Sequence, residues 1–290
     1  MPALYIGRNG QGTEVRKLHR DVANLVPSVR LVDEDEARAM HPFIAPGYVE
    51  LAMLEPGGME IDVHAVHQGY TRGLRKHGGL IKLSTKVVDA KRQSGIWLVT
   101  DSAGNRYETK VLVNASGAWV DEIAAVAGVM PIGIRPLRRT IFMIPAPLGD
   151  LPPSLPMIAD LDATFYLKPE RNQFLCSPAD ETLQPPSDAR TDTLEIARAL
   201  DAINDATTLN ARHVRASWAG LRNFAPDRLP VVGYDPLVDD FFWFAGQGGY
   251  GIQTAPALAR FGASIIRGSV LDADILDRGL DVAALSPSRW

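Results

Sequence analysis

The feature that most constrains the fold is an apolar run that passes directly into glycines and then into a helical pattern. Residues 241–245 read Phe-Phe-Trp-Phe-Ala, residues 246–251 hold four glycines, and residues 255–266 are rich in alanine at helical spacing. A buried strand that turns through glycines into a helix presents bare N–H groups and the positive end of the helix dipole to a ligand. The sequence predicts such a ligand-binding turn, and the alternative is a tight turn with no ligand.

The spacing and position of these glycines limit the kind of ligand site they can form. Gly246, Gly248 and Gly251 match the G-x-G-x-x-G pattern of dinucleotide sites, although the match alone is not specific. Fewer than 40 residues follow Gly251, so the other strands of a nucleotide-binding unit cannot come after it. We therefore expect these glycines to serve a ligand that earlier parts of the chain hold.

A second junction of the same kind occurs earlier in the chain. Residues 111–113 form a valine- and leucine-rich run, predicted to be a parallel strand buried on both sides, and residues 120–128 form the next helix. Two such junctions on one sheet would place two helix N-termini at its carboxyl edge, where open α/β sheets bind ligands. Ser116 lies in this turn, but the G-x-S-x-G pattern is absent, which argues against a serine hydrolase.

Composition excludes several classes of protein. The 290 residues are 46% hydrophobic and 22% charged with a net charge of −4, and no basic stripe with interleaved aromatics suggests a nucleic-acid partner. The sequence contains no run of about 18 apolar residues, so no membrane span is expected. The N-terminus lacks the pattern of a signal peptide. The single cysteine, Cys176, excludes an internal disulfide and fits a reducing cytoplasm. His64 and His67 have the spacing of metal ligands without a third ligand nearby, so no metal site is expected.

The alternation of patterns predicts two interleaved domains, one made of residues 1–53 and 131–235, the other of residues 54–130 and 236–290. Asp33 and Asp62 are expected to cap helices that end at Met40 and His77. The predicted short strands cover residues 3–7, 48–54, 80–83, 86–90, 96–100, 107–110, 138–144, 164–168, 173–176, 212–221 and 231–233.

Taken together, the motifs resemble the D-amino-acid oxidase superfamily of flavoproteins, most closely its bacterial D-arginine dehydrogenase-like members. The resemblance covers nearly the whole chain in one order. The motifs that carry it are Asp62 with His67-Gln68-Gly69-Tyr70, residues 111–119, Arg138-Arg139, residues 165–169, Trp218-Ala219-Gly220-Leu221-Arg222 and residues 246–254.

The resemblance implies a fold of mixed α/β class: an N-terminally truncated, Rossmann-like FAD-binding domain interleaved with a mixed-sheet substrate domain. It also implies hydride transfer from a D-2-amino acid to FAD, hydrolysis of the imine to a 2-oxo acid and ammonia, and an unidentified electron acceptor. Because Cys176 lies outside the glycine turns, non-covalent FAD is expected. The implied FAD-binding residues are Val87, Ala115, Ser116, Gly117, Trp119, Gly220, Gly246, Gln247, Gly248, Gly249, Tyr250, Gly251, Ile252 and Gln253.

Three residues are candidates for substrate binding. A 2-amino acid presents a carboxylate that a planar guanidinium can bind through two hydrogen bonds, and Arg222 ends a predicted strand beside a glycine turn. The family pattern adds Tyr166 to this carboxylate site and Arg139 to the pocket wall. The alternative for Arg222 is an interdomain salt bridge, and the alternative for Tyr166 is an ordinary half-buried tyrosine on a strand. Arg138 and Arg139 are adjacent on a strand, so only one of them can face the pocket.

Three features depart from the family pattern. The opening residues 1–7 are expected to correspond to the first substrate-domain strand of the pattern, so the strand–turn–helix that carries the family's N-terminal G-x-G-x-x-G is expected to be missing from this sequence. Without it, the strands at Val111 and Phe241 are expected to lack a neighbour and to leave apolar surface open. A shortened chain, a remnant that no longer binds FAD, or a half completed by another polypeptide would each explain this.

The other two departures concern chemistry. Residues 2–4 are apolar where D-arginine dehydrogenases carry an acidic side chain, which argues against a strict preference for basic substrates. Gln253 stands where related sarcosine oxidases carry a lysine, which favours a dehydrogenase. A D-2-hydroxy-acid dehydrogenase and a non-catalytic subunit remain the alternative functions.

Overall fold

The computed structural model describes residues 1–147 and 149–290, which form two compact units. The first unit contains residues Met1–Glu60, Arg138–Thr182 and Asp188–Gly220, and the second contains Ile61–Leu137, Leu183–Ser187 and Leu221–Trp290. The second unit therefore takes in residues 221–235, which the sequence pattern had placed in the substrate domain. Each unit is described by itself.

The first unit is built on a mixed sheet with the order β12-β8-β11-β10-β9-β1-β3-β2, and β13 also pairs with β8. β1 runs parallel to β9 and antiparallel to β3. The strands of this sheet are β1 (Ala3–Arg8), β2 (Arg30–Val32), β3 (Val49–Glu55), β8 (Arg135–Pro145), β9 (Met157–Asp160), β10 (Tyr166–Glu170), β11 (Gln173–Ser177), β12 (Thr182–Leu183) and β13 (Ala216–Phe224).

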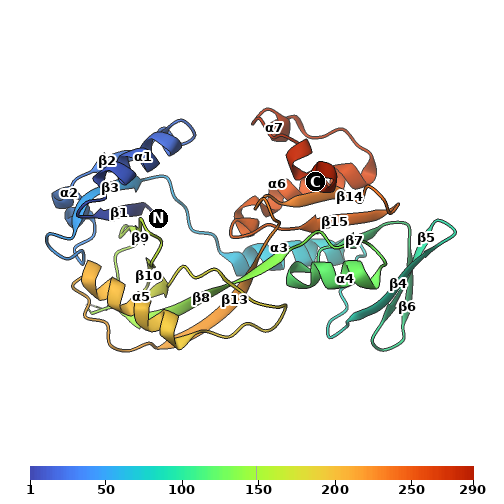
Figure 1. The fold of residues 1–290 in the computed structure, drawn as a ribbon, viewed down its shortest axis with the longest axis horizontal. Coiled ribbons are helices and arrows are strands. Elements are labelled where there is room, and N and C mark those ends of the chain that lie inside the picture. The colour runs from blue at the N-terminus through green and yellow to red at the C-terminus, as the bar shows by residue number, and fades with distance from the viewer. Residues whose placement is uncertain (148) are drawn as a thin grey trace. The chain divides into compact units, whose positions relative to one another are not determined.

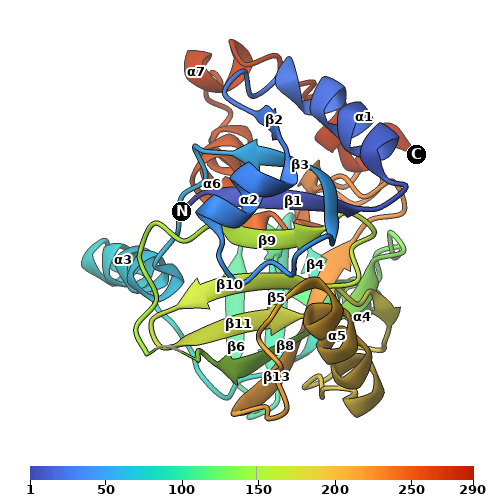
Figure 2. The same ribbon diagram turned by 90° about the vertical axis from the view of Figure 1, so that its left-hand side faces the viewer.

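Three helices cover this sheet. They are α1 (Gly12–Ala23), α2 (Glu34–Met40) and α5 (Thr193–Ala206), which lies against one face of the sheet (Figure 2). α5 buries Ile196, Ala199 and Ile203, a helical spacing that places all three in the core with Ile158 and Leu167 of the sheet. The side chain of Asp33 accepts a hydrogen bond from the Glu36 N–H, so it caps α2 as the sequence predicts.

The second unit contains a three-stranded sheet with the order β14-β15-β7 and a separate meander with the order β4-β5-β6 (Figure 1). β7 runs parallel to β15, and β14 runs antiparallel to it. The elements are α3 (Val63–Lys76), β4 (Val87–Gln93), β5 (Ile96–Asp101), β6 (Arg106–Thr109), β7 (Leu112–Asn114), α4 (Val120–Val126), β14 (Val231–Tyr234), β15 (Phe241–Ala245), α6 (Gly251–Arg267) and α7 (Ala273–Leu276).

The alternating side chains of β15 hold the second unit together. Phe241 and Trp243 point into a core with Trp97 of the meander, and Phe242 points into a second core with Leu258 and Phe261 of α6. Phe241, Phe242 and Trp243 are fully buried, and each contributes about 1.5–3 kcal/mol by leaving water. This two-sided burial explains why residues 241–245 read as a continuous apolar run.

The mixed α/β fold class expected from the sequence is confirmed, with three local corrections. Residues 80–83 form no strand, and Leu80 and Leu83 are exposed. β15 does not lack a neighbour: β14, formed by residues 231–234, pairs with the side of β15 that faces away from β7. Val113 is 43% exposed, so the parallel strand β7 is not buried on both sides.

Candidate functional site

The two predicted strand-to-helix turns meet at one edge of the β14-β15-β7 sheet. Because β7 and β15 are parallel neighbours, the turns that follow Asn114 and Ala245 leave the sheet at the same end. The link between them is Asn223 at the end of β13: its carbonyl accepts the Gly248 N–H at 2.9 Å, and its Nδ2 lies 3.8 Å from the position of a Cβ on Gly117. The structure therefore brings both turns together within the second unit.

The glycine turn is shaped so that only glycine fits at its centre. Gly246 and Gly248 have φ values of 72° and 56°, in the left-handed region that side chains disfavour. A Cβ on Gly248 would also collide with the Phe224 ring. Phe224 pairs with Gln247 through an isolated antiparallel bridge, and the guanidinium carbon of Arg228 lies 3.9 Å from the centroid of the Phe224 ring. β13 and the turn are thus fixed to each other.

Arg222 lies directly on this turn. A Cβ built on Gly249 would be 2.9 Å from Arg222 Nη1 and 3.0 Å from Cζ, so the guanidinium occupies the space that the missing side chain leaves. Arg222 and residues 246–251 both belong to the second unit. Arg222 therefore lies against the backbone of the glycine turn within the second unit.

The helix that follows the turn begins earlier than the sequence pattern indicates. α6 starts at Gly251 instead of Ala255, and its N-cap residue, Tyr250, makes no side-chain capping hydrogen bond within the described chain. Tyr250 instead donates its hydroxyl hydrogen to the Arg228 carbonyl. Gln253 is therefore exposed in the first turn of α6, where backbone N–H groups favour negative charge.

A cavity of about 550 Å³ lies beside the other turn. Its lining includes Val87, Ala115, Ser116 and Trp119, four residues that the sequence analysis assigned to FAD. Asn114 fixes the shape of this turn from inside: its Nδ2 donates to the Val120 carbonyl at 2.8 Å, and its Oδ1 accepts the Ser116 hydroxyl hydrogen at 2.7 Å. Ser116 therefore has an amide oxygen as its partner and no base that would make it a nucleophile.

Tyr166, Arg139 and Gly220 belong to the first unit. Tyr166 begins β10 and pairs with Ser177 and Ala159. Arg139 Nε donates to the Asp180 carbonyl at 2.9 Å, while Arg138 donates to Oδ2 of the same residue at 2.9 Å. The adjacent arginines thus use different parts of Asp180, and the structure does not join Tyr166 or Arg139 to the glycine turn within one unit.

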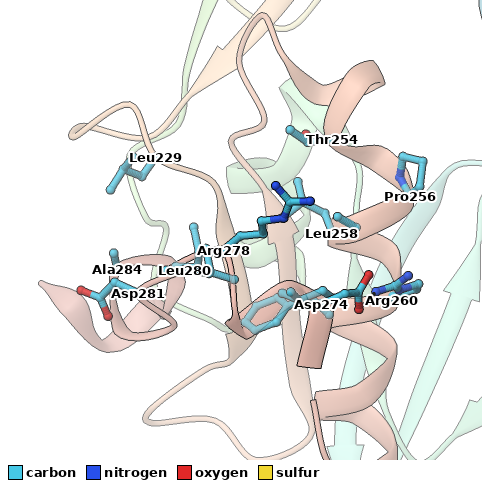
Figure 3. A pocket seen from close by; sticks show the side chains of 15 residues that line it. Leu229, Thr254, Pro256, Leu258, Arg260, Asp274, Arg278, Leu280, Asp281 and Ala284 are labelled. Atoms are coloured by element: carbon cyan, nitrogen blue, oxygen red, sulfur yellow. Dashed lines mark hydrogen bonds and ion pairs between the residues drawn. The ribbon is translucent and has the colours of Figure 1, made fainter. Parts of the chain in front are cut away.

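A second cavity, of about 660 Å³, lies between α6 and the segment around α7 (Figure 3). Its walls include Leu258, Phe261 and Leu280, and Arg278 extends across it (Figure 3). None of the residues that the sequence analysis assigned to a site lines this cavity. It therefore adds nothing to the arrangement at the glycine turn.

Three further features of residues 1–147 and 149–290 bear on the site. No group of three or more His, Cys, Asp or Glu side chains in this part of the chain could hold a metal ion. No helix in the same ranges has the length and apolarity needed to cross a membrane. Cys176 is buried in β11, and burial raises the pKa of its thiol well above the ordinary value.

Sequence reasoning missed Asn223 and Phe224, which fix the glycine turn. They directly follow Arg222, and the signal that could have found them is their place between that arginine and the proline-rich turn at residues 226–230. A neighbouring strand end that supports a ligand turn leaves no spacing pattern of its own, because its contacts join residues more than 20 positions apart.

A parallel strand pair with two helix N-termini at its carboxyl edge, a glycine turn and an adjacent cavity defines an α/β protein that binds a ligand of nucleotide type. Residues 2–265 match the family described as FAD dependent oxidoreductase. The chain belongs to this family, whose cofactor is FAD.

The chain is also similar to individual proteins of known name. It is 24% identical to the mitochondrial dimethylglycine dehydrogenase of Mus musculus over 256 residues, which cover 80% of this chain and 28% of that protein. The fold is similar to glycine oxidase from Geobacillus kaustophilus (TM-score 0.83, 20% identity, 100% of this chain and 75% of that one). It is also similar to L-proline dehydrogenase from P. horikoshii (TM-score 0.77, 21% identity, 96% and 77%). The chain thus spans less than a third of the dehydrogenase it matches, and the structural likenesses concern the fold.

The residues present fit an FAD site in part. The cavity of about 550 Å³ lies within the usual range for small-molecule sites, and four of the six residues of the Gly246–Gly251 turn are glycines. The open N-terminus of α6 suits a ring edge that gains negative charge on reduction. These features lie at one sheet edge, as a single extended cofactor requires.

Proposed function

We propose that this chain provides the substrate-binding part and a share of the cofactor-binding part of a flavoprotein that oxidises D-2-amino acids. The position of Arg222 against the Gly249 backbone supports the proposal, because a guanidinium there could bind a carboxylate beside the turn to which we assign the flavin ring. FAD, bound without a covalent link, would supply the two-electron acceptor for the α-hydrogen. The family and the amine and amino-acid oxidoreductases among its relatives support this class of reaction.

In this proposal Arg222 binds the substrate carboxylate through two charge-assisted hydrogen bonds and fixes the orientation of the α-carbon. Tyr166 supports the same carboxylate, and Arg139 lines the pocket. The N–H groups of the glycine turn and the N-terminus of α6 stabilise the negative charge that the reaction places near them. The imine product hydrolyses in water to a 2-oxo acid and ammonia.

The finer features of the proposal come from the sequence. D-specific substrates and the likeness to D-arginine dehydrogenases follow from the motif resemblance, and the apolar residues 2–4 favour small or apolar side chains over basic ones. Gln253 favours an electron acceptor other than dioxygen. A reducing, cytoplasmic location follows from the single cysteine.

Replacement of Arg222 tests the proposal directly. Arg222→Ala should lower kcat/KM for D-amino acids by two to three orders of magnitude, because a bidentate charged contact contributes about 3–5 kcal/mol. Arg222→Lys should recover only part of the loss, since an ammonium cannot reproduce the planar pair of hydrogen bonds. Arg278→Ala, which removes an arginine from the other cavity, is the matched control and should leave kcat/KM unchanged.

The measurement begins with the visible spectrum of the purified chain after addition of FAD, followed by anaerobic bleaching with D-amino acids. A loss of less than threefold for Arg222→Ala would remove this residue from the site. A chain that takes up no FAD would contradict cofactor binding by these residues alone. A D-2-hydroxy-acid substrate would show instead as turnover with a flat pH profile, because oxidation of an amine needs the neutral amine and should rise with pH.

A further inference from the structure

The sheet of the first unit has one face that α5 covers and another face that carries the candidate substrate residues of that unit. Tyr166 of β10 lies opposite Ser177 of β11, and Leu175 lies opposite Met143 of β8. Directly opposed residues of paired strands share a face, and so do alternate residues along one strand. Arg139, four residues before Met143 on β8, therefore shares a face with Tyr166.

The chain itself supplies a carboxylate to Arg139. Arg139 Nε donates to the Asp180 carbonyl at 2.9 Å, and Nη2 donates to Glu181 Oε1 at 3.3 Å. The Arg139 side chain is 12% exposed, so its guanidinium has lost most of its contact with water. A guanidinium in this state binds a carboxylate readily, and Glu181 already takes that place.

A buried network holds Glu181 at this position. The carboxylate of the preceding residue, Asp180, accepts hydrogen bonds from the Thr140 N–H at 2.6 Å, from the Thr140 hydroxyl at 2.9 Å and from Arg138 Nε at 2.9 Å. Asp180 and Thr140 are both buried. Moving this segment would leave buried polar groups unsatisfied, which is costly. The network therefore keeps Glu181 beside Arg139.

A second cation on the same face is compensated in the same way. Lys168 lies two residues after Tyr166 on β10, so the two side chains share a face. Its Nζ forms ion pairs with Glu60 and, at 2.9 Å, with Glu170. With Glu181 included, the chain's carboxylates outnumber the cations that they pair with here. A further carboxylate brought to this face by a ligand would meet like charge.

We propose that Glu181 acts through Arg139 as a positioning residue that determines substrate specificity: it makes the pocket reject D-2-amino acids with a second carboxylate and accept those with a neutral side chain. The inference rests on the proposed function, which assigns the α-carboxylate to Arg222 and Tyr166 and leaves Arg139 on the pocket wall. A side-chain carboxylate that reached Arg139 would have to share the guanidinium with Glu181. A side-chain amide of the same size accepts a hydrogen bond and adds no charge.

Kinetics with D-glutamine and D-glutamate test the inference in the holoenzyme. In the native protein kcat/KM for D-glutamine should exceed that for D-glutamate by about tenfold or more. Glu181→Gln should raise kcat/KM for D-glutamate about tenfold and change that for D-glutamine by less than about twofold, because only the glutamate gains a charged hydrogen bond. Glu36→Gln, which also removes a carboxylate from an arginine of the first unit, Arg30, is the matched control and should change neither.

A second measurement needs neither flavin nor turnover. In calorimetric titrations of the purified chain without FAD, Glu181→Gln should bind glutarate about tenfold more tightly than the native chain does. Adding Arg139→Gln to this variant should remove the gain, because the two substitutions act on one ion pair. Glutaramate, in which an amide replaces one carboxylate, should bind the native chain and Glu181→Gln alike.

The outcomes separate this inference from the proposed function. Equal glutarate affinity of the native chain and Glu181→Gln would overturn the inference, as would a gain that persists without Arg139. Oxidation of D-glutamate and D-glutamine with equal kcat/KM by the native protein would contradict the inference and leave the proposed function intact. A gain in glutarate affinity that depends on Arg139, with no oxidation of any D-amino acid, would contradict the proposed function alone.

Discussion

At the scale of single residues, Gly248 and Gly249 are adjacent but constrained by different neighbours. Gly248 has a left-handed φ of 56° and faces the Phe224 ring, whereas a Cβ on Gly249 would meet the end of the flexible Arg222 side chain. An aromatic ring fixed by Arg228 cannot move aside, but a guanidinium can. The two glycines should therefore respond to the same substitution in different ways.

Gly248→Ala should lower the free energy of unfolding by about 1–3 kcal/mol, because it adds backbone strain and an overpacked contact. Gly249→Ala should change stability by less than about 1 kcal/mol but displace Arg222, and should thus raise KM for D-amino acids. Urea denaturation and steady-state kinetics of both variants measure the contrast. Equal effects of the two substitutions on stability would contradict this reading of the turn.

His41 is a second residue whose environment sets a measurable property. It is fully buried beside Phe43 and Phe174, and within the described part of the chain neither ring nitrogen has a hydrogen-bond partner. Burial lowers the pKa of His41 to about 4. The imidazole is therefore neutral in the folded protein at pH 7.

The depressed pKa predicts the direction of a pH effect on stability. The unfolded chain binds a proton at His41 near pH 6.5, and the folded chain only near pH 4. The contribution of His41 to the free energy of unfolding is therefore complete above pH 6.5 and is lost as the pH falls towards 4. Protonation of His41 in the unfolded chain should lower the free energy of unfolding by about 3 kcal/mol over this pH range. His41→Leu should flatten the dependence over this window and leave stability at pH 7 unchanged or increased, as measured by urea denaturation at a series of pH values. Parallel pH curves for the two proteins would exclude His41 as the source.

At the scale of elements, α3 and α6 show the same amphipathic pattern with opposite outcomes. Phe261 of α6 is 1% exposed and packs with Phe242, while Tyr70 of α3 is 52% exposed. The sequence predicts both helices and the Asp62 cap of α3, because caps and periodicity are local, although α6 begins at Gly251 instead of Ala255. It cannot predict which stripe finds a partner, because that depends on a sheet formed from distant segments.

A pair of substitutions should separate the two helices. Phe261→Ala should lower the free energy of unfolding of the second unit by about 3–5 kcal/mol, since it removes a buried ring that packs in the core with Phe242 and enlarges the cavity that the ring already lines. Tyr70→Ser should change the stability of the purified chain by less than about 0.5 kcal/mol, because Tyr70 is 52% exposed on the surface of α3. Chemical denaturation followed by tryptophan fluorescence is the measurement, and a large cost for Tyr70→Ser would show that α3 is already packed.

At the scale of the whole molecule, two units with separate cores share one chain that passes between them several times. The core of the first unit contains Cys176, the single cysteine of the sequence, and the core of the second contains Trp97 and Trp243. Thiol reactivity thus reports on the first unit. Tryptophan fluorescence reports mainly on the second unit, which contains every tryptophan except Trp218.

We expect these two probes to respond separately to mutation. Ile203→Ala, in the core of the first unit, should increase the rate of Cys176 labelling by at least about tenfold, because it destabilises that unit by about 2–5 kcal/mol. Phe261→Ala should shift the fluorescence transition and leave the labelling rate nearly unchanged. Coincident shifts of both probes in both variants would show that the two units unfold as one cooperative body.

The sequence by itself determined the local elements and the chemistry of the two turns, because capping aspartates, strand and helix periodicity and left-handed glycines act within a few residues. It also placed the chain among flavoproteins through the order of its motifs. Only the tertiary structure decided that Arg222 lies on Gly249, that β14 pairs with β15, and that β7 and α3 remain open. Strand pairing and side-chain packing join residues far apart in the chain, and no local pattern specifies which distant segments will meet.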